Sequence, residues 1–184
     1  QKTLQYLEPK PGERHLDLGC GTGFLTYELH KLPCSYYGVD FCQETVDEVT
    51  RSLAKEKPSN VMSVLNADAD DLPYDDRFFD LATCLGVLGY YPPVYRRKVL
   101  GELRRVLKHN GRAALDYPNP LNPRIYDALQ IEAFRGSRLF LEDLADVEKG
   151  VVDCGFEVRQ SFTHNVMMVY IVSPYLDWTK WEIA

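Results

Sequence analysis

Three glycines at alternate positions constrain this chain more than any other feature of its sequence. Gly19, Gly21 and Gly23 follow the short apolar run at residues 14–18, and a helical pattern over residues 22–32 begins at once. Glycine tolerates positive φ and lets the backbone approach a ligand without a Cβ in the way. The N–H groups at a helix N-terminus suit a carboxylate or a phosphate. The segment therefore predicts a strand, a tight turn and a helix that together receive a nucleotide-like ligand.

Two acidic residues narrow the class of that ligand. Asp40 ends the next expected strand, where a carboxylate can accept both hydroxyls of a ribose. The dinucleotide fingerprint G-x-G-x-x-G needs a small residue at position 24, but this chain has Phe24 and its third glycine comes one residue early. Asp17, at the end of the first strand, is poorly placed for a pyrophosphate and well placed for an ammonium group. An amino acid joined to a nucleoside through a sulfonium therefore fits better than a dinucleotide.

The rest of the chain alternates strand-like apolar runs with helical patterns, which is typical of a parallel sheet with crossover helices. The expected strands are residues 14–18, 36–40, 61–65, 78–85, 112–117, 156–162 and 166–172. The expected helices are residues 22–32, 43–57, 93–108, a stretch that ends at residue 134, and 139–153. We expect an α/β fold: a Rossmann-like, doubly wound, mostly parallel seven-stranded sheet with a C-terminal antiparallel hairpin. Residues 1–184 are expected to form a single domain with a short or missing N-terminal lid.

Charge and cysteine content argue against several functions. The formal net charge of −6 argues against a nucleic-acid partner, because proteins bind nucleic acids through a basic surface that neutralises phosphates. The five cysteines form no CxxC pair and are odd in number, which predicts reduced thiols and a cytoplasmic location. The four histidines are isolated, so no metal site is expected. No apolar run approaches the roughly 20 residues of a membrane span, and no signal peptide is visible.

The ordered motifs resemble those of the class I S-adenosylmethionine-dependent methyltransferases, in particular the small-molecule group related to the ubiquinone-biosynthesis enzymes. The resemblance runs from about residue 4 to residue 172 and is carried by residues 16–23, 38–40, 68–74, 78–81 and 102–112. It implies an enzyme that uses S-adenosyl-L-methionine and releases S-adenosyl-L-homocysteine. The methyl group would pass to an O, N or C nucleophile of a small-molecule acceptor.

The resemblance also implies a set of cofactor-binding residues at the carboxyl ends of the first four strands, namely Asp17, Gly19, Cys20, Gly21, Gly23, Asp40, Phe41, Asp68, Ala69 and Leu85. Asp17 and the backbone of the glycine loop would hold the methionine end, and Asp40 would bind the ribose. Phe41 would pack beside the adenine, while Asp68 and Ala69 would lie at its amino edge and ring nitrogen.

Three of these residues also have a plain structural interpretation. Asp40 could cap the helix that begins near Gln43, and Phe41 could pack in the core. Asp68 opens an acidic run that could be a solvated loop. The sequence leaves these alternatives open.

No catalytic base is identified by the sequence. Methyl transfer from a sulfonium is an in-line displacement on an activated donor, so alignment and desolvation of the nucleophile are the main requirements. Tyr90, Tyr91 and Tyr117 are candidates for shaping or hydrogen-bonding the acceptor, and each could equally be an aromatic wall. Asp116 suggests the metal site of catechol-type enzymes, but no partner carboxylate follows the fourth expected strand, so metal dependence is not expected.

The acceptor itself is not readable from the sequence. Residues 119–138, after the fifth expected strand, could form an apolar lid with a few polar anchors, which favours a small aromatic or aliphatic molecule. Three other functions remain: an inactive cofactor-binding interaction protein, an RNA or protein methyltransferase, and a nicotinamide oxidoreductase. The basic helix face over residues 97–108 is better explained as a solvated surface than as an RNA site.

Overall fold

The computed structural model describes residues 2–22 and 32–174 of the 184-residue chain. Within these ranges the strands of one seven-stranded sheet are β1 (Arg14–Leu18), β2 (Ser35–Asp40), β3 (Val61–Asn66), β4 (Phe79–Cys84), β5 (Leu107–Pro118), β6 (Phe156–His164) and β7 (Met167–Pro174). The helices are α1 (Lys2–Leu7), α3 (Gln43–Glu56), the 3₁₀ helix η2 (Leu88–Tyr90), α4 (Pro93–Val106), α5 (Ile125–Phe134) and α6 (Leu144–Asp153). Gly23 and nearly all of the helix predicted at residues 22–32 lie outside the described residues.

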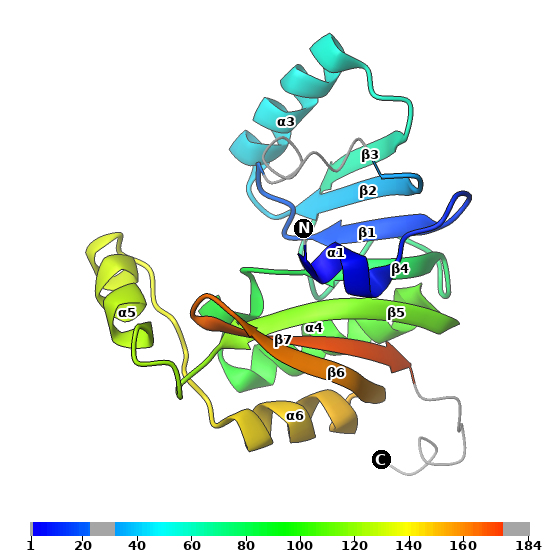
Figure 1. The fold of residues 1–184 in the computed structure, drawn as a ribbon. Helices are drawn as coiled ribbons and strands as arrows, with labels where there is room; N and C mark the ends of the chain where they lie inside the picture. The colour runs from blue at the N-terminus through cyan, green and yellow to red at the C-terminus, as the bar shows by residue number, and fades with distance from the viewer. Residues whose placement is uncertain (1, 23–31, 175–184) are drawn as a thin grey trace.

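The sheet confirms the predicted architecture. Its strand order is β3-β2-β1-β4-β5-β7-β6; the first five strands are parallel, and β7 runs antiparallel to both β5 and β6 (Figure 1). The chain winds outward from β1 to β3 and then returns to place β4 on the other side of β1. Such a reversal opens a crevice at the carboxyl ends of the two central strands, which is where ligands bind in open α/β sheets.

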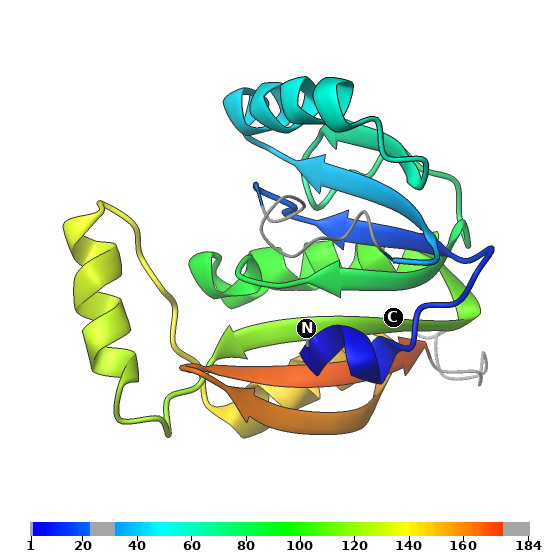
Figure 2. The same ribbon diagram turned by 45° about the horizontal axis from the view of Figure 1, so that its top comes forward.

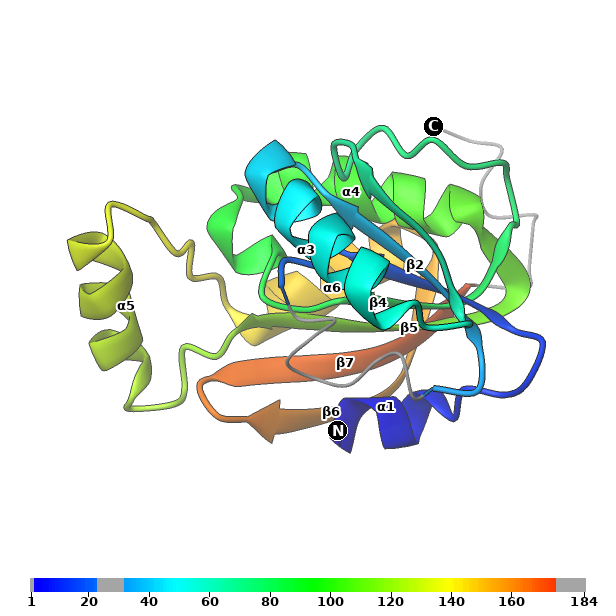
Figure 3. The same cartoon turned by 90° about the horizontal axis from the view of Figure 1, so that it is seen from above.

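Helices cover both faces of the sheet. α4 and α6 pack on one face, where Val99, Leu103 and Val151 share a buried cluster with strand residues. α1 lies on the opposite face, across β5 and β7, where Leu7 is fully buried (Figure 2). α5 stands apart from the sheet, as the view from above shows (Figure 3). Only Ile125 of that helix is buried.

Two predicted helix boundaries were wrong. α4 ends at Val106, because Leu107 is extended, fully buried and paired with Phe79 of β4. The pairing then resumes at Arg112, so residues 108–111 form an irregular segment within β5 instead of ending a helix. α6 begins at residue 144 because the Asp143 side chain accepts a hydrogen bond from the N–H of residue 145 at 2.8 Å, which caps the helix there.

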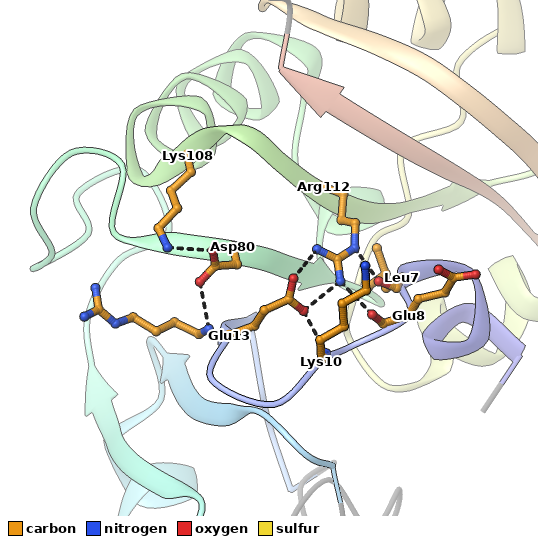
Figure 4. Close-up of polar contacts among 8 residues, drawn as sticks. Leu7, Glu8, Lys10, Glu13, Asp80, Lys108 and Arg112 are labelled. Atoms are coloured by element: carbon orange, nitrogen blue, oxygen red, sulfur yellow. Dashed lines mark hydrogen bonds and ion pairs between the residues drawn. The ribbon is translucent and has the colours of Figure 1, made fainter.

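Arg112 of β5 ties the N-terminal segment to the sheet (Figure 4). Its guanidinium donates to the backbone carbonyls of Leu7 and Glu8 at the end of α1. It also forms a two-pronged ion pair with Glu13, with nitrogen–oxygen distances of 2.9 and 2.8 Å. The Glu13 carboxylate accepts a further hydrogen bond from the N–H of Lys10 at 2.8 Å. A single side chain therefore satisfies the carboxyl end of α1 and fixes the connection from α1 to β1.

A second ion pair in the same region supports β4. The Asp80 carboxylate accepts hydrogen bonds from the Lys108 ammonium at 2.6 Å and from the N–H of Arg14 at 3.0 Å (Figure 4). These contacts join the amino-terminal ends of β1 and β4 to the start of β5. They lie at the edge of the sheet opposite the crevice and leave the crevice free of this network.

Replacing Arg112 with alanine is expected to lower the free energy of unfolding by about 2–3 kcal/mol, the range for hydrogen bonds to charged groups that are partly buried. Urea denaturation at pH 7 measures this loss. Burial raises the pKa of Glu13, but the hydrogen bonds from Arg112 and Lys10 outweigh it and hold that pKa below its usual value. The difference between wild type and Arg112→Ala should therefore shrink at acidic pH, as Glu13 is protonated.

Arg135→Ala is the matched control, since Arg135 forms an ion pair with Glu132 at 3.1 Å but is 67% exposed. An exposed pair contributes about 0–1 kcal/mol. Equal losses in the two variants would contradict a structural role for Arg112.

Candidate functional site

Two cavities open at the carboxyl ends of the central strands. Cavity A has a volume of about 540 Å³ and includes in its lining Gly19, Gly21, Asp40, Phe41, Asp68, Ala69, Gly86, Val87, Tyr90, Tyr91 and Tyr95. Cavity B has a volume of about 380 Å³ and includes in its lining Thr3, Leu4, Asp17, Gly19, Cys20, Thr83, Leu85, Gly86, Asp116 and Met167. Gly19 and Gly86 line both, so the two cavities share a wall between β1 and β4.

The turn after β1 needs glycine for two separate reasons. Gly19 has φ +71°, and a Cβ built on it would lie 2.2 Å from a methyl carbon of Val87. Gly21 has φ +49° with no heavy atom near its missing Cβ. Gly19 is therefore required both by its positive φ and by the close approach of Val87, whereas Gly21 is required by its positive φ alone.

The N–H groups of this turn are already hydrogen-bonded within the protein. Those of Gly19 and Cys20 donate to the carbonyl of Val39 at 2.8 and 3.0 Å, and that of Gly21 donates to Asp40 Oδ2 at 2.8 Å. A pyrophosphate cradle requires such groups to point at the ligand. Because these N–H groups are not available to a phosphate, the turn favours a ligand whose polar groups donate to the carboxylates of Asp17 and Asp40. This agrees with the preference for a nucleoside–amino acid conjugate.

Asp40 is positioned by the backbone on both sides of it. Its Oδ1 accepts from the N–H of Cys42 at 2.9 Å, and its side chain is 8% exposed at the wall of cavity A. Cys42, and not Asp40, occupies the N-cap of α3, so the helix-capping interpretation of Asp40 was wrong. Asn66 at the end of β3 donates to the carbonyls of Asp40 and Phe41 at 3.1 and 2.8 Å. The sequence analysis missed Asn66, whose position directly after an apolar strand was the available signal.

The walls of cavity A are rich in aromatic rings. Phe41 is 67% exposed, which excludes the interpretation that it packs in the core. Tyr91 stacks on Tyr95 with ring centroids 4.5 Å apart. The Tyr95 hydroxyl donates to Asp70 at 3.1 Å, next to the predicted pair Asp68 and Ala69. These rings and the acidic loop surround a space that suits a flat heterocycle with polar edges.

Asp17 lies at the end of a buried chain of hydrogen bonds. Its two oxygens accept from the hydroxyls of Tyr36 at 2.8 Å and Thr83 at 2.7 Å. Because the Thr83 hydroxyl gives its single proton to Asp17, its oxygen accepts from Nε2 of His15, 2.9 Å away. Burial lowers the pKa of His15, so this fully buried imidazole is neutral at pH 7. The network orients Asp17 toward cavity B.

Cys20 shares this environment and remains a protonated thiol at neutral pH. Burial, together with the charges of Asp17 and Asp40, raises the pKa of its thiol to about 12. A thiolate is the nucleophilic form of cysteine, so Cys20 contributes shape to cavity B and no reactivity.

Cavity B also contains the carboxyl group of Asp116, which accepts a backbone hydrogen bond but, among the described residues, none from a hydroxyl group. Burial raises the pKa of Asp116 to about 6, although the N–H of Gly86 donates to its Oδ1 at 2.7 Å. Thr3 and Leu4 of α1 form part of the wall, together with Leu85 after β4. The sequence analysis expected little from the N-terminal segment, because six helical residues carry too weak a periodic signal to be recognised.

Comparison with known proteins agrees with this geometry. Residues 16–111 match the family model described as a methyltransferase domain. The chain is 36% identical over 126 residues to a 2-phytyl-1,4-naphtoquinone methyltransferase of Trichormus variabilis, with 66% of this chain and 54% of that protein covered. It is 34% identical over 129 residues to a demethylmenaquinone methyltransferase of Lactobacillus johnsonii, with 68% and 52% covered. The chain belongs to the class I S-adenosylmethionine-dependent methyltransferases.

A solved structure shares the fold of this methyltransferase. The magnesium protoporphyrin IX methyltransferase of Synechocystis, with bound S-adenosylhomocysteine, aligns with a TM-score of 0.74 at 22% identity and covers 94% of this chain and 78% of that one. The methyltransferase chain spans about half the length of the two curated relatives named above.

The three tyrosines proposed for the acceptor fall in two different places. Tyr90 and Tyr91 line cavity A. Tyr117 is 2% exposed and packs on the face covered by α4 and α6, with the Arg96 guanidinium 5.4 Å from its ring centre. Alternation along β5 explains this result, because Asp116 and Tyr117 must point to opposite faces of the sheet. Tyr117 therefore lines neither cavity of the methyltransferase.

The segment at residues 119–138 braces the hairpin more than it covers the site. The N–H of Asn119 donates to the carbonyl of Val166 at 2.9 Å, and the Asn122 side chain donates to that of Asn165 at 2.7 Å. Only Ser137 and its neighbour at residue 138 reach a cavity, and it is cavity A. The segment thus supports the turn between β6 and β7, and its role as an acceptor lid stays a prediction.

Two expected absences can be examined over the described residues. No group of three or more metal-binding side chains occurs among residues 2–22 and 32–174 of the methyltransferase. Among the same residues, no helix has the length and apolar character needed to cross a membrane.

Gly19→Ala should destabilise the methyltransferase by about 3 kcal/mol, because strain at positive φ and overlap with Val87 add together. Gly12→Ala is the matched control: Gly12 has φ +83° but nothing within 4 Å of its missing Cβ. That variant should lose only the conformational part, about 1 kcal/mol. Urea unfolding of both variants measures the difference, and equal losses would contradict the close approach to Val87.

Proposed function

We propose that this methyltransferase binds S-adenosylmethionine along cavity A and transfers its methyl group to a small aromatic acceptor in cavity B. The observation that carries the proposal is the wall shared at Gly19 and Gly86. Gly86 has no side chain and nothing within 4 Å of its missing Cβ, so a donor on one side and an acceptor on the other can approach each other past it. The volumes of both cavities fall in the range of about 300–1,000 Å³ that is usual for small-molecule sites.

Cavity A supports the orientation of the cofactor. Asp40 retains lone pairs beyond the two that accept N–H groups, and these can accept the ribose hydroxyls. Phe41 offers an exposed ring beside the adenine position, and Asp68 and Ala69 can meet its polar edge. Asp17 and the loop at Gly19 lie on the side of cavity B, where the ammonium group of the methionine end would find an acidic partner.

When bound, the cofactor supplies a methyl group activated by a positively charged sulfur. The residues of the chain then need to hold the acceptor in line with that methyl group and to exclude water. Apolar side chains from α1, from the segment after β4 and from β7 suit this task in cavity B, namely Leu4, Leu85 and Met167. The carboxyl groups of Asp17 and Asp116 provide polarity in a mostly apolar space.

The acceptor class is proposed from relatives and from the shape of the site together. Two relatives are named as methyltransferases of a naphthoquinone and of demethylmenaquinone. A hydroquinone ring is flat and apolar with hydroxyl groups at its edge, which matches the apolar walls and the carboxyl groups of cavity B. A cytoplasmic location remains a prediction; it accords with the five cysteines, all of which are free thiols.

Asp40→Asn should weaken the binding of S-adenosylhomocysteine by tenfold or more, about 1.4 kcal/mol, because it removes the charge that strengthens the ribose hydrogen bonds. The amide oxygen preserves one of the two backbone hydrogen bonds of Asp40, and thermal unfolding checks that the variant is folded. Calorimetric titration measures the affinity. Asp75→Asn, at an exposed carboxylate, is the control and should bind as the wild type does.

NADH titrated in the same way tests the alternative of a nicotinamide oxidoreductase. Binding of NADH without binding of S-adenosylhomocysteine would refute the proposed cofactor. The acceptor is then tested with 1,4-naphthohydroquinone held reduced under nitrogen, with the methylated product detected by mass spectrometry. Tight cofactor binding without any methylated product would favour an inactive interaction protein.

A further inference from the structure

Asp116 occupies an unusual position in cavity B. It is the third residue from the carboxyl end of β5 and is 8% exposed. Its side chain points to the face of the sheet that α1 covers. Its Oδ1 accepts from the N–H of Gly86 at 2.7 Å. Among the described residues no hydrogen bond or ion pair reaches Oδ2, although a carboxylate has about four acceptor sites. One oxygen is therefore anchored next to the wall between the cavities, and the other is available to a ligand.

Within residues 2–22 and 32–174, no cationic side chain in the lining of cavity B stabilises the charge of Asp116. Asp17 of β1 lines the same cavity. The Cys84 thiol and the Tyr90 hydroxyl do not line it, but the charge of Asp116 adds to burial in raising the pKa of both. The only charged or titratable group in the cavity lining from the hairpin of β6 and β7 is His164, which is exposed, and α1 contributes Thr3 and Leu4. Burying a carboxyl group without a partner is costly. A sequence that keeps one in a cleft commonly does so for function.

We propose that Asp116 is the general base that accepts the hydroxyl proton of a phenolic or hydroquinone acceptor during methyl transfer. The inference rests on the proposed function and specifies its chemistry. Asp116 and Leu4 both line cavity B, so an aromatic ring can contact Leu4 while its hydroxyl donates to Oδ2. Anchoring by Gly86 keeps the carboxyl group beside the position where the methyl group is transferred.

The step balances in atoms and charge. The O–H bond of the acceptor breaks and its proton passes to Oδ2 of Asp116. The released electron pair forms a bond from the oxygen, or from the adjacent ring carbon, to the methyl carbon. The bond from that carbon to sulfur breaks and leaves both electrons on sulfur as a neutral thioether. If carbon is the nucleophile, the ring hydrogen then moves to oxygen and restores the aromatic ring. Asp116 finally loses its proton to solvent.

The acidity of Asp116 suits this role. Burial raises its pKa to about 6, so the group is mostly ionised at pH 7 yet is a stronger base than an ordinary carboxylate. General bases work best when their pKa lies near the working pH. Asp17 is less suited, since hydroxyl groups of Tyr36 and Thr83 already donate to both of its oxygens.

The competing interpretation is that Asp116 only supports the turn at Gly86, which has φ +71°. Asp116→Asn separates the two roles. An asparagine amide oxygen can still accept from the N–H of Gly86, but it cannot accept a proton at neutral pH. The matched control is Asp153→Asn, at an exposed carboxylate of α6 remote from the cavity lining.

The kinetic test uses a reduced naphthohydroquinone and S-adenosylmethionine. Asp116→Asn should lower kcat by about 10²- to 10⁴-fold, the usual contribution of a general base, while the affinity for S-adenosylhomocysteine stays within about twofold of wild type. The wild-type kcat should rise with pH through about pH 6, and this limb should be absent in the variant. A variant that retains both kcat and the rising limb overturns the proposal.

A binding test makes the inference independent of turnover. The probe is 2-naphthol, titrated into the complex with S-adenosylhomocysteine between pH 5 and pH 8. In the wild type its affinity should increase as Asp116 ionises and becomes a better acceptor, and in Asp116→Asn the affinity should be lower and independent of pH. Naphthol binding that ignores both pH and the substitution overturns the inference. A chain that binds no S-adenosylhomocysteine at all instead refutes the proposed function.

Thermal unfolding checks that the variant is folded. Because the native pKa of Asp116 is raised above its unfolded value, this group favours folding least at high pH, where it is ionised in both states. Asp116→Asn should therefore have a Tm at or above that of the wild type at pH 8, with the difference shrinking toward pH 4. A kinetic loss in a variant of equal or higher Tm is chemical and not a loss of folded protein.

Discussion

The turn at Gly19 is the constraint on which the rest of the site depends. Its N–H and that of Cys20 donate to Val39 of β2, while its missing side chain admits Val87 from the segment after β4. One residue thus sets the carboxyl end of β1 relative to both of its neighbours. Because Gly21 then donates to Asp40, the same turn orients the carboxylate at the end of β2. The two cavities exist side by side because these three strands end in a fixed relation.

The chain treats the two carboxyl groups of cavity B in opposite ways. Asp17 receives two hydroxyl donors, and behind them the neutral imidazole of His15 donates to Thr83. These hydrogen bonds hold both oxygens of the Asp17 carboxyl group in place. Asp116 receives a single N–H, and its pKa rises to about 6 as a result of burial. One carboxylate is therefore suited to a fixed electrostatic role and the other to a change of protonation.

The N-terminal helix α1 lines cavity B, and its position there depends on a contact at the opposite edge of the sheet. Arg112 holds the carboxyl end of α1 and the connection to β1 at the opposite edge of the sheet. With that end fixed, Leu7 packs between β5 and β7 and the first turn of α1 reaches cavity B with Thr3 and Leu4. Loss of the clamp would be felt first in stability and then in the shape of the acceptor pocket.

The sequence by itself determined the parallel sheet, its antiparallel hairpin and about half of the residues around cavity A. These features follow from local patterns: apolar runs of strand length, amphipathic helices, and glycines and acidic residues at strand ends. The tertiary structure decided where α4 gives way to β5, that Tyr117 faces away from the crevice, and that α1 closes cavity B. It also decided that Asp116 is buried with one hydrogen-bond donor. Each of these depends on contacts between residues distant in sequence, such as Arg112 with Glu8 and Gly86 with Asp116, and no local pattern encodes such contacts.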